Sequence, residues 1–457
     1  MATYSPLANV IISLATASFD RDGFGIPLFM SAHRYSSNRV IAVTKDSYST
    51  KLPTNSAVFA AAQTAFAQPN GLSQLLIGRI EADAQIGLLA APAQNDNFKI
   101  TVEVNDGDKI EIDYTEVAAS PTQEIVLDGI KSLLDADGNI ADHVATAVVG
   151  SGDAARLVLT TATGNTDYFI VSGLSGLFDE YVDQETATEA YTAIKAENDT
   201  FYAVTSEIKT PTWIEALATS VNADDKQYWF TVSDQDVLQP IANPAVDVLA
   251  SIKEKAFERV VGGYHQDANT SFPEVGALAY NLPFLAGTIV WGNDRTSGIS
   301  VSQDDTGKNL TRTEKQYLLD RNAFFWDLQG GITFLNSDVK TSSGERPENI
   351  RGRDNMEVDI AASVSELLLN QVGRKIPYTS RGIAQITSVV DTTLQTYVQR
   401  GFIEGDYVIS APDARLIAGG IKATQKLDNL TFVAQLSGAI TMVDAIRGTL
   451  QLDEVVQ

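Results

Sequence analysis

Helix and strand patterns alternate through the middle of this 457-residue chain, and this alternation limits the folds open to it. Apolar residues recur at helical spacing in three segments and alternate or run together in three others. In chain order the expected elements are helix Ala187–Ala196, strand Phe201–Thr205, helix Pro211–Val221, strand Gln227–Ser233, helix Ala245–Phe257 and strand Arg259–Tyr264. Repeated strand–helix–strand units predict a mostly parallel sheet that is covered by helices.

Both ends of the chain have the side-chain period of two that is typical of half-buried strands. The apolar positions of these two patterns are Val10, Ile12, Leu14, Ile446, Leu450 and Leu452. A further strand pair is expected over Asn429–Leu436 and Ala439–Val443. Chain ends are usually frayed and polar, so apolar ends indicate arms that dock on a sheet. That sheet belongs either to this chain, as an ordinary edge strand, or to a neighbouring molecule.

Residues 96–175 differ in texture from the segments on either side. Strands Lys99–Asn105 and Lys109–Thr115 flank a hairpin signal, helix Glu124–Leu134 follows, and three more short strands complete the segment. Residues 96–170 hold 14 acidic and 4 basic residues, against 6 acidic and 7 basic in residues 346–400. The pattern predicts a small, acidic, β-rich domain inserted into a larger one.

The expected fold class is therefore a multidomain α+β or α/β protein with mixed sheets and flanking helices. We divide the chain into an N-terminal arm (1–20), a discontinuous α/β middle domain (21–95 and 176–340), the inserted outer domain (96–175) and a C-terminal domain with a strand arm (341–457). The last domain is predicted to contain two amphipathic helices, Met356–Gln371 and Ile383–Arg400.

Composition removes most enzyme classes. There is no cysteine, and the three histidines lie far apart at His33, His143 and His265. The phosphate-loop, dinucleotide, nucleophile-elbow and zinc-protease motifs are all missing. We therefore expect no enzyme, no cofactor and no metal site.

The same composition limits the partners. A net charge of −25 argues against nucleic acid or anionic lipid as the main partner. No run of 18 apolar residues exists, so membrane insertion is not expected. A signal peptide is not expected either, because Met1–Pro6 has no basic region.

One modest basic cluster surrounds the first C-terminal helix. It comprises Arg346, Arg351, Arg353, Arg374, Lys375 and Arg381. These side chains are either solvated charges that compensate helix dipoles or a docking face for an acidic protein surface, with nucleic-acid binding as a third reading.

Several segments, taken in order, resemble one known family. They are Ala8–Leu14, Gly23–Phe29, Asn322–Phe334, Lys375–Thr379 with Gly382-Ile383 after it, and Phe432–Ile440. Together they are similar to the tail-sheath proteins of contractile-tailed bacteriophages. The resemblance covers the two ends of the chain, whereas residues 96–175 match no part of that family's pattern.

The resemblance implies a structural subunit that forms a helical sheath or stacked rings around a tail tube. Contraction would drive the tube through the host envelope, and the terminal arms would add strands to neighbouring subunits. The implied partners are other copies, the tube protein, and baseplate and tail terminator proteins. The implied location is the virion tail, with assembly in the host cytoplasm. Arg351, Arg353, Arg374 and Lys375 are the candidates to face the tube.

Two other functions stay open. One is a virion-borne adhesin or carbohydrate-active protein with a binding module at 96–175. The other is a tail-tube or baseplate protein, which the length and the helix content of the chain disfavour, because tube proteins of that kind are shorter and all-β.

Overall fold

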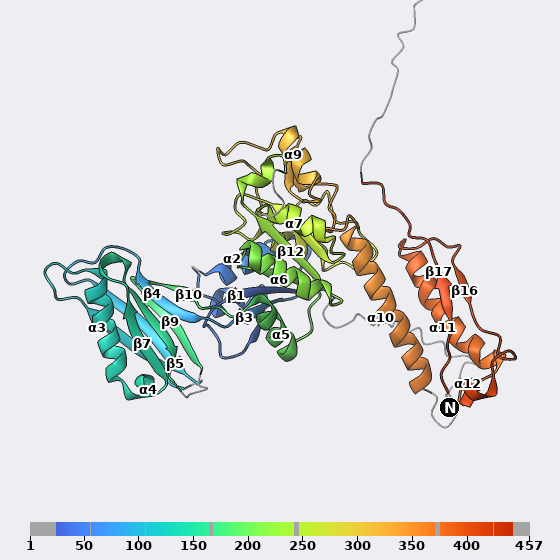
Figure 1. Ribbon diagram of the computed structural model, residues 1–457, viewed down its shortest axis with the longest axis horizontal. Helices are drawn as coiled ribbons and strands as arrows, with labels where there is room; N and C mark the ends of the chain where they lie inside the picture. Colours follow the sequence, from blue (N-terminus) through green and yellow to red (C-terminus); the bar gives the residue numbers. More distant parts are fainter. Residues whose placement is uncertain are drawn as a thin grey trace, which may run out of the picture. The chain divides into compact units, whose positions relative to one another are not determined.

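A computed structural model describes residues 24–441 apart from 55, 106, 164–167, 242–245, 371–374 and 424. The chain divides into two compact units. One contains Gly25–Ile350 and Ala439–Gln457, and the other contains Met1–Phe24 and Arg351–Gly438. The mixed α/β class expected from the sequence is confirmed (Figure 1).

A six-stranded sheet forms the centre of the first unit, in the order β13-β12-β11-β1-β3-β2. Its strands are β1 (Pro27–Ala32), β2 (Val40–Val43), β3 (Leu75–Ile80), β11 (Ala203–Ser206), β12 (Gln227–Val232) and β13 (Val260–Tyr264). All neighbouring pairs are parallel except β2 with β3. Leu28 is in register with Leu76 on one side and Val204 on the other, so β1 is fully flanked. This is the parallel sheet that the alternation predicts.

Helices cover both faces of this sheet. Successive residues of a strand point to opposite faces, so neighbouring residues of β1 belong to different cores. Leu28 belongs to a core that includes α5 (Ala187–Glu197), α6 (Pro211–Asn222) and α7 (Val248–Lys255). Its neighbour Phe29 belongs to a second core on the other face of the sheet, to which two more helices contribute. They are α2 (Ala57–Phe66) and α8 (Pro273–Asn281).

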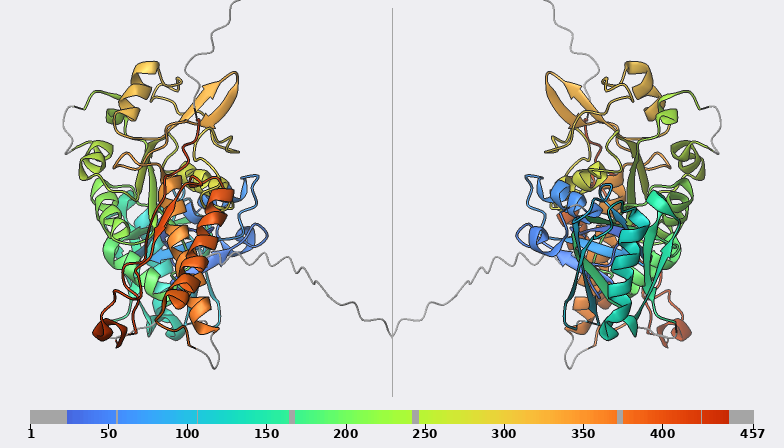
Figure 2. Two further views of the ribbon diagram at one scale, coloured as in Figure 1. Left: turned by 90° about the vertical axis from the view of Figure 1, so that its right-hand side faces the viewer. Right: turned by 90° about the vertical axis from the view of Figure 1, so that its left-hand side faces the viewer.

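The inserted segment has its own core between two antiparallel sheets and a helix (Figure 2). One sheet has the order β10-β4-β8-β7, and the other has the order β6-β5-β9. The elements are β4 (Asp83–Leu88), β5 (Asn97–Val104), β6 (Ile110–Thr115), α3 (Gln123–Ala136), α4 (Gly138–Ala141), β7 (Val144–Val149), η1 (Gly152–Ala154), β8 (Arg156–Thr161), β9 (Phe169–Ser175) and β10 (Leu177–Val182). We call residues 83–182 the insert, since β4 and β10 lie outside 96–175 but belong to its sheet.

The rest of the first unit is mostly loop. It holds α1 (Tyr48–Lys51), η2 (Gln235–Leu238), α9 (Arg312–Leu319), β14 (Trp326–Gln329) and β15 (Ile332–Leu335). Strands β14 and β15 form a hairpin with Gly330-Gly331 at its turn, and both glycines have positive φ, of 58° and 80°. Two such residues in a row suit a turn whose twist matches that of the flanking strands.

The second unit contains α11 (Ser380–Gln399), β16 (Val408–Ser410), α12 (Gly419–Ala423), β17 (Thr431–Val433) and all of α10 (Pro347–Leu369) except its first turn. Helix α10 begins nine residues before the predicted Met356. Gly352 lies within it, where an added Cβ would be 2.3 Å from the Phe402 ring. The strand expected over Ala439–Val443 is wrong for residues 439–441, which form none, and the remaining two residues lie outside the described part.

Candidate assembly surface

A two-stranded antiparallel ribbon lies at the centre of the second unit. Val408 is in register with Val433, and Ile403 forms an isolated bridge with Leu436, so the pairing extends from residues 402–410 to residues 431–437. The backbone N–H of Glu404 donates to the Gln435 carbonyl at 2.8 Å. No third strand joins this ribbon among the residues that the structure describes. A two-stranded sheet is marginal by itself, and its unpaired edges can accept another strand.

The inner face of the ribbon packs on helices α10 and α11. Ile409 and Phe432 contact a small core that is formed by Val390, Leu394, Tyr397, Phe402 and Ile403. Three of these five residues come from α11, which has the helical spacing expected from the sequence. The helices thus support one face of the ribbon and leave the other face open.

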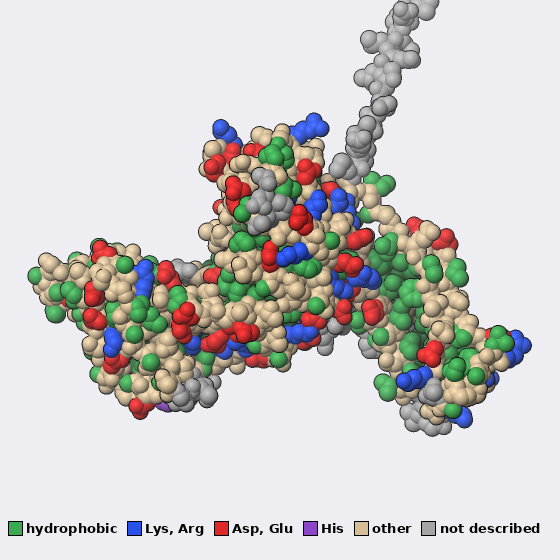
Figure 3. All heavy atoms as spheres, viewed as in Figure 1, with side chains coloured by type: hydrophobic (Ala, Val, Ile, Leu, Met, Phe, Trp, Pro, Cys, Tyr) green, Lys and Arg blue, Asp and Glu red, His purple; other side chains and the backbone are tan. Residues whose placement is uncertain are grey.

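The outer face exposes large apolar side chains. Val408 is 64% exposed and its cross-strand partner Val433 is 72% exposed. Leu436, Leu416 and Ile440 are also exposed, and hydrophobic side chains reach the surface over this unit in Figure 3. A cross-strand pair of exposed valines is an apolar surface that another molecule can cover. The sequence indicates this exposed apolar face, because Val433 lies between the polar residues Thr431 and Gln435 on the side of the predicted strand that should face solvent.

Two hydrogen-bonded tyrosines fix the elements of this unit. The Tyr397 hydroxyl donates to Asp359 Oδ2 at 2.7 Å, and the guanidinium of Arg400 lies 4.7 Å from the Tyr397 ring. Burial and the bond to Asp359 raise the pKa of Tyr397, so its hydroxyl stays protonated. The Tyr407 hydroxyl donates to Asp391 Oδ1 at 2.6 Å, which ties the start of the ribbon to α11. The ribbon is therefore held in place by side-chain bonds as well as by its small core.

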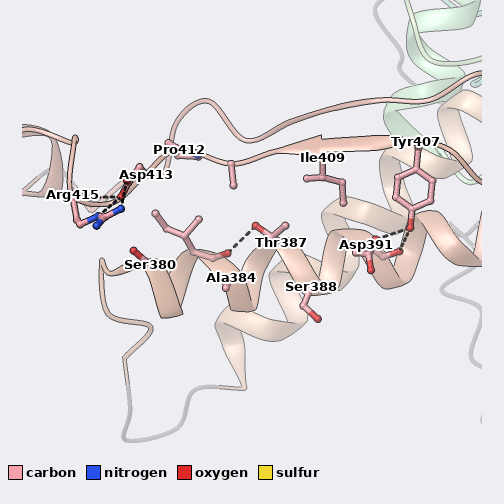
Figure 4. Close-up of a pocket in the computed structure, with 12 residues that line it drawn as sticks. Ser380, Ala384, Thr387, Ser388, Asp391, Tyr407, Ile409, Pro412, Asp413 and Arg415 are labelled. Atoms are coloured by element: carbon pink, nitrogen blue, oxygen red, sulfur yellow. Dashed lines mark hydrogen bonds and ion pairs between the residues drawn. The ribbon is translucent and has the colours of Figure 1, made fainter.

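A cavity of about 670 Å³ lies between α11 and the ribbon, beside β16 (Figure 4). Ile383, Ala384 and Thr387 line it from the helix, and Ile409 and Pro412 line it from the strand side. Apolar side chains therefore border the edge of β16.

A second cavity, of about 590 Å³, lies between α10, α11 and the residues that lead into β17. Its apolar lining includes Ile360, Val364, Ile386 and Leu430. The two cavities leave room for additional apolar side chains on this unit.

The site residues predicted from the sequence lie in different surroundings. The arm residues Val10, Ile12, Leu14, Ile446, Leu450 and Leu452, and also Arg374, lie outside the described residues. Arg351 is only 3% exposed, and its Nη2 donates to the Phe24 carbonyl at 3.1 Å. Arg353 is exposed, with Nε 3.5 Å from Asp354 Oδ1, and Lys375 is also exposed. Arg351 is thus part of the interior, and only Arg353 and Lys375 lie on the described surface.

The described residues contain neither a metal-ion site nor a membrane-spanning helix. No group of three or more acidic or histidine side chains could hold a metal ion there. None of the helices in the described ranges has the length and apolar character needed to cross a membrane.

Comparison with known proteins finds similarity only among solved structures. No protein-family model matches the chain, and no curated protein matches it. The sheath tail protein of Listeria innocua is similar at 12% identity and a TM-score of 0.45, over 85% of this chain and 89% of that chain. The sheath tail protein of Desulfitobacterium hafniense is similar at 11% identity and a TM-score of 0.44, over 90% of this chain and 93% of that chain. A chain of the anti-feeding prophage baseplate in its contracted state is similar at 11% identity and a TM-score of 0.49, over 100% of both chains. Likeness at this level does not by itself assign a function.

Proposed function

We propose that this chain is the structural subunit of a contractile tail sheath. Copies would polymerise around a tail tube, as a helical sheath or stacked rings, and contract to drive the tube through a cell envelope. Baseplate and terminator proteins would bind at the two ends of the polymer. The observation that carries the proposal is the ribbon of residues 402–410 and 431–437, which has helices on one face, exposed valines on the other and room beside β16.

A strand donated by a second copy fits this ribbon. The segment with Ile446, Leu450 and Leu452 has the period of a strand and would supply apolar side chains on one face. Each backbone hydrogen bond of the added strand contributes about 0.5–1.5 kcal/mol net. Each apolar side chain that becomes buried contributes about 1.5–3 kcal/mol. Both terms recur at every subunit, which suits a long polymer.

The experiment compares charge substitutions on the ribbon with a matched control. Val433→Asp places a carboxylate on the exposed outer face, and Val117→Asp does so on the insert, where Val117 is 76% exposed. We expect both single chains to fold and to melt like the parent protein. Only Val433→Asp should abolish tube-length polymers in negative-stain microscopy, because an unpaired charge cannot be buried at a contact.

The donated arm is tested separately. Removal of residues 445–457, or Leu450→Asp, should leave the melting temperature of the single chain unchanged and should prevent polymerisation. Normal tubes from either variant would refute strand donation. A large loss of melting temperature would instead show that the strand belongs to its own subunit.

The tube contact is a finer part of the proposal. Arg353 and Lys375 are the exposed residues among the four candidates to face the tube, and an acidic tube surface would attract them. The double variant Arg353→Glu/Lys375→Glu should weaken tube co-assembly at low salt more than at high salt, because salt screens exposed charges. Equal co-assembly at low salt would remove these residues from the contact.

The alternative of a carbohydrate-active insert has less support. A glycosidase needs one carboxyl with a raised pKa to act as the acid. The hydrogen bond from Lys99 lowers the pKa of Asp113. At Asp135, burial raises the pKa, but hydrogen bonds from Lys131 and Thr146 outweigh it and leave the pKa low. Both carboxyls are therefore held ionised by neighbours within residues 96–175, whereas Asp83, whose pKa burial raises, lies outside that module.

A further inference from the structure

The insert joins the parallel sheet through two linked connections. The chain enters the insert after β3, through Glu81 and Ala82, and returns to the sheet through Glu185. The N–H of Glu185 donates to the Glu81 carbonyl at 3.0 Å, and the N–H of Glu81 donates to Glu185 Oε1 at 2.8 Å. Strands β4 and β10 then continue side by side into the insert. Two connections that are bonded to each other restrict bending more than a single linker would.

Arg34, which follows β1, reaches from the sheet to the first connection and to the insert. It is only 4% exposed. Its Nε donates to the Ala82 carbonyl at 3.0 Å, and its Nη2 lies 3.0 Å from Glu81 Oε1. Its guanidinium carbon lies 4.1 Å from the centre of the Phe169 ring, which belongs to β9 of the insert. One buried cation therefore contacts the connection and the inserted sheet together.

A second arginine repeats the arrangement one strand away. Arg79 on β3 has its guanidinium carbon 4.0 Å from the centre of the Tyr168 ring, and its Nη2 lies 3.4 Å from Glu81 Oε2. The backbone also takes part, because the N–H of Val171 donates to the Arg34 carbonyl at 3.1 Å. We call Arg34 and Arg79, with the rings of Tyr168 and Phe169, the arginine clamp.

A tyrosine network adjoins the clamp. The Tyr181 hydroxyl donates to Asp179 Oδ2 at 2.6 Å and accepts the N–H of Arg34 at 3.3 Å. The Tyr35 hydroxyl lies 3.4 Å from the same Asp179 oxygen. Burial raises the pKa of Tyr181, so the network keeps its protons at any ordinary pH.

We propose that the arginine clamp locks the insert to the parallel sheet, so that the two move as one rigid body. Rotation of the insert would remove the aromatic rings from two guanidinium groups that are shielded from water. A cation–π contact is stronger where water is excluded, so the open state is disfavoured. This is a property of the single chain and does not depend on the proposed assembly.

The natural absence of cysteine makes the test direct. Ser132→Cys on α3 and Thr219→Cys on α6 place spin labels at two exposed positions, one on each side of the joint. Pulsed electron paramagnetic resonance on the full chain should give one narrow distance distribution. Tyr168→Ala in this background should at least double its width.

Tyr114→Ala is the matched control, because the Tyr114 ring packs over Gly129 inside the insert, away from the joint. It should leave the distribution narrow. A second variant, Tyr168→Leu, keeps the apolar volume and removes only the aromatic face, so it should broaden the distribution while the fold is retained. A broad distribution in the unsubstituted protein would overturn the proposal, and a narrow one in both Tyr168 variants would do the same.

Discussion

Asp294→Asn should stabilise the first unit at alkaline pH and have little effect at acidic pH. Asp294 is 7% exposed and accepts a hydrogen bond from Asn281 Nδ2 at 2.7 Å. Burial raises its pKa from 3.8 to about 7, although the bonds from Asn281 and Gly292 oppose the shift. Burial likewise raises the pKa of Glu348 to about 7, and the charge of Asp294 adds to that effect.

The direction of the pH dependence follows from the fact that Asp294 binds its proton more tightly in the folded protein than in the unfolded chain. The folded protein holds the Asp294 proton up to a pH of about 7, whereas the unfolded chain releases it near 3.8. This carboxyl therefore contributes its full stability below pH 3.8 and loses it as the pH rises through about 7. The difference of about 3 in pKa corresponds to about 4 kcal/mol, which is lost at about 1.4 kcal/mol per pH unit.

The pH dependence of the unsubstituted protein alone does not isolate this effect. His33 acts in the opposite sense, because burial and then Arg79 and Arg39 lower its pKa from 6.5 to about 3. It contributes stability above pH 6.5, which is lost as the pH falls. The diagnostic quantity is the difference in unfolding free energy between Asp294→Asn and the parent protein. It should grow by about 2.5 kcal/mol from pH 5 to pH 7.5.

Urea unfolding followed by tryptophan fluorescence measures this difference. Trp291 is fully buried, and the centre of its ring lies 5.0 Å from that of Trp229. The fluorescence signal therefore reports on the first unit. The exposed Asp46→Asn serves as the control and should give a difference that does not change with pH. A flat difference for Asp294→Asn between pH 5 and 7.5, or one that shrinks, would refute the reasoning.

Two further predictions concern packing. Glu274→Gln should cost about 3–5 kcal/mol in urea unfolding, because it leaves the buried Lys209, now 2.6 Å from the carboxylate, without its counter-ion; replacement of both residues by apolar ones should cost less. Gly352→Ala should cost about 1–3 kcal/mol, since the new methyl would meet the Phe402 ring at 2.3 Å. Gly419→Ala, in open space on α12, should cost nothing, and equal melting temperatures for the two glycine variants would contradict this account.

The parallel sheet was predictable because its signal is local. Each strand of the Ala187–Tyr264 region is a short apolar run between helices with clear ends. Thr186, for example, caps α5 by accepting a hydrogen bond from the N–H of Glu189, whose side chain bonds back to the cap. Such features are visible within a dozen residues, so the alternation alone predicts three strands of the sheet and the helices that cover one of its faces.

The missed elements depend on distant partners. Strand β4 has the sequence DAQIGL, with only three large or moderately apolar positions, and it is fixed by pairing with β8 and β10 about 70 to 100 positions further on. Helix α10 begins early because Gly352, which weakens a helix by itself, fits against Phe402.

The candidate surface was harder to predict than the fold. The arms were read from their period, and nothing in the described residues tests them. Arg351 looked like one member of an exposed basic cluster, yet it is buried and donates a hydrogen bond to the Phe24 carbonyl, far away along the chain. No local pattern distinguishes an arginine with such a distant partner from its solvated neighbours.

The contact between Arg351 and Phe24 also limits the order in which parts of the chain can fold during synthesis. The two residues are 327 positions apart, and the unit that contains them takes residues from both ends of the chain. At about 5–20 residues per second, a ribosome needs roughly 16–65 seconds to synthesise the intervening segment. The ribbon at residues 402–437 emerges later still. We expect a nascent chain to complete its parallel sheet before it completes this ribbon.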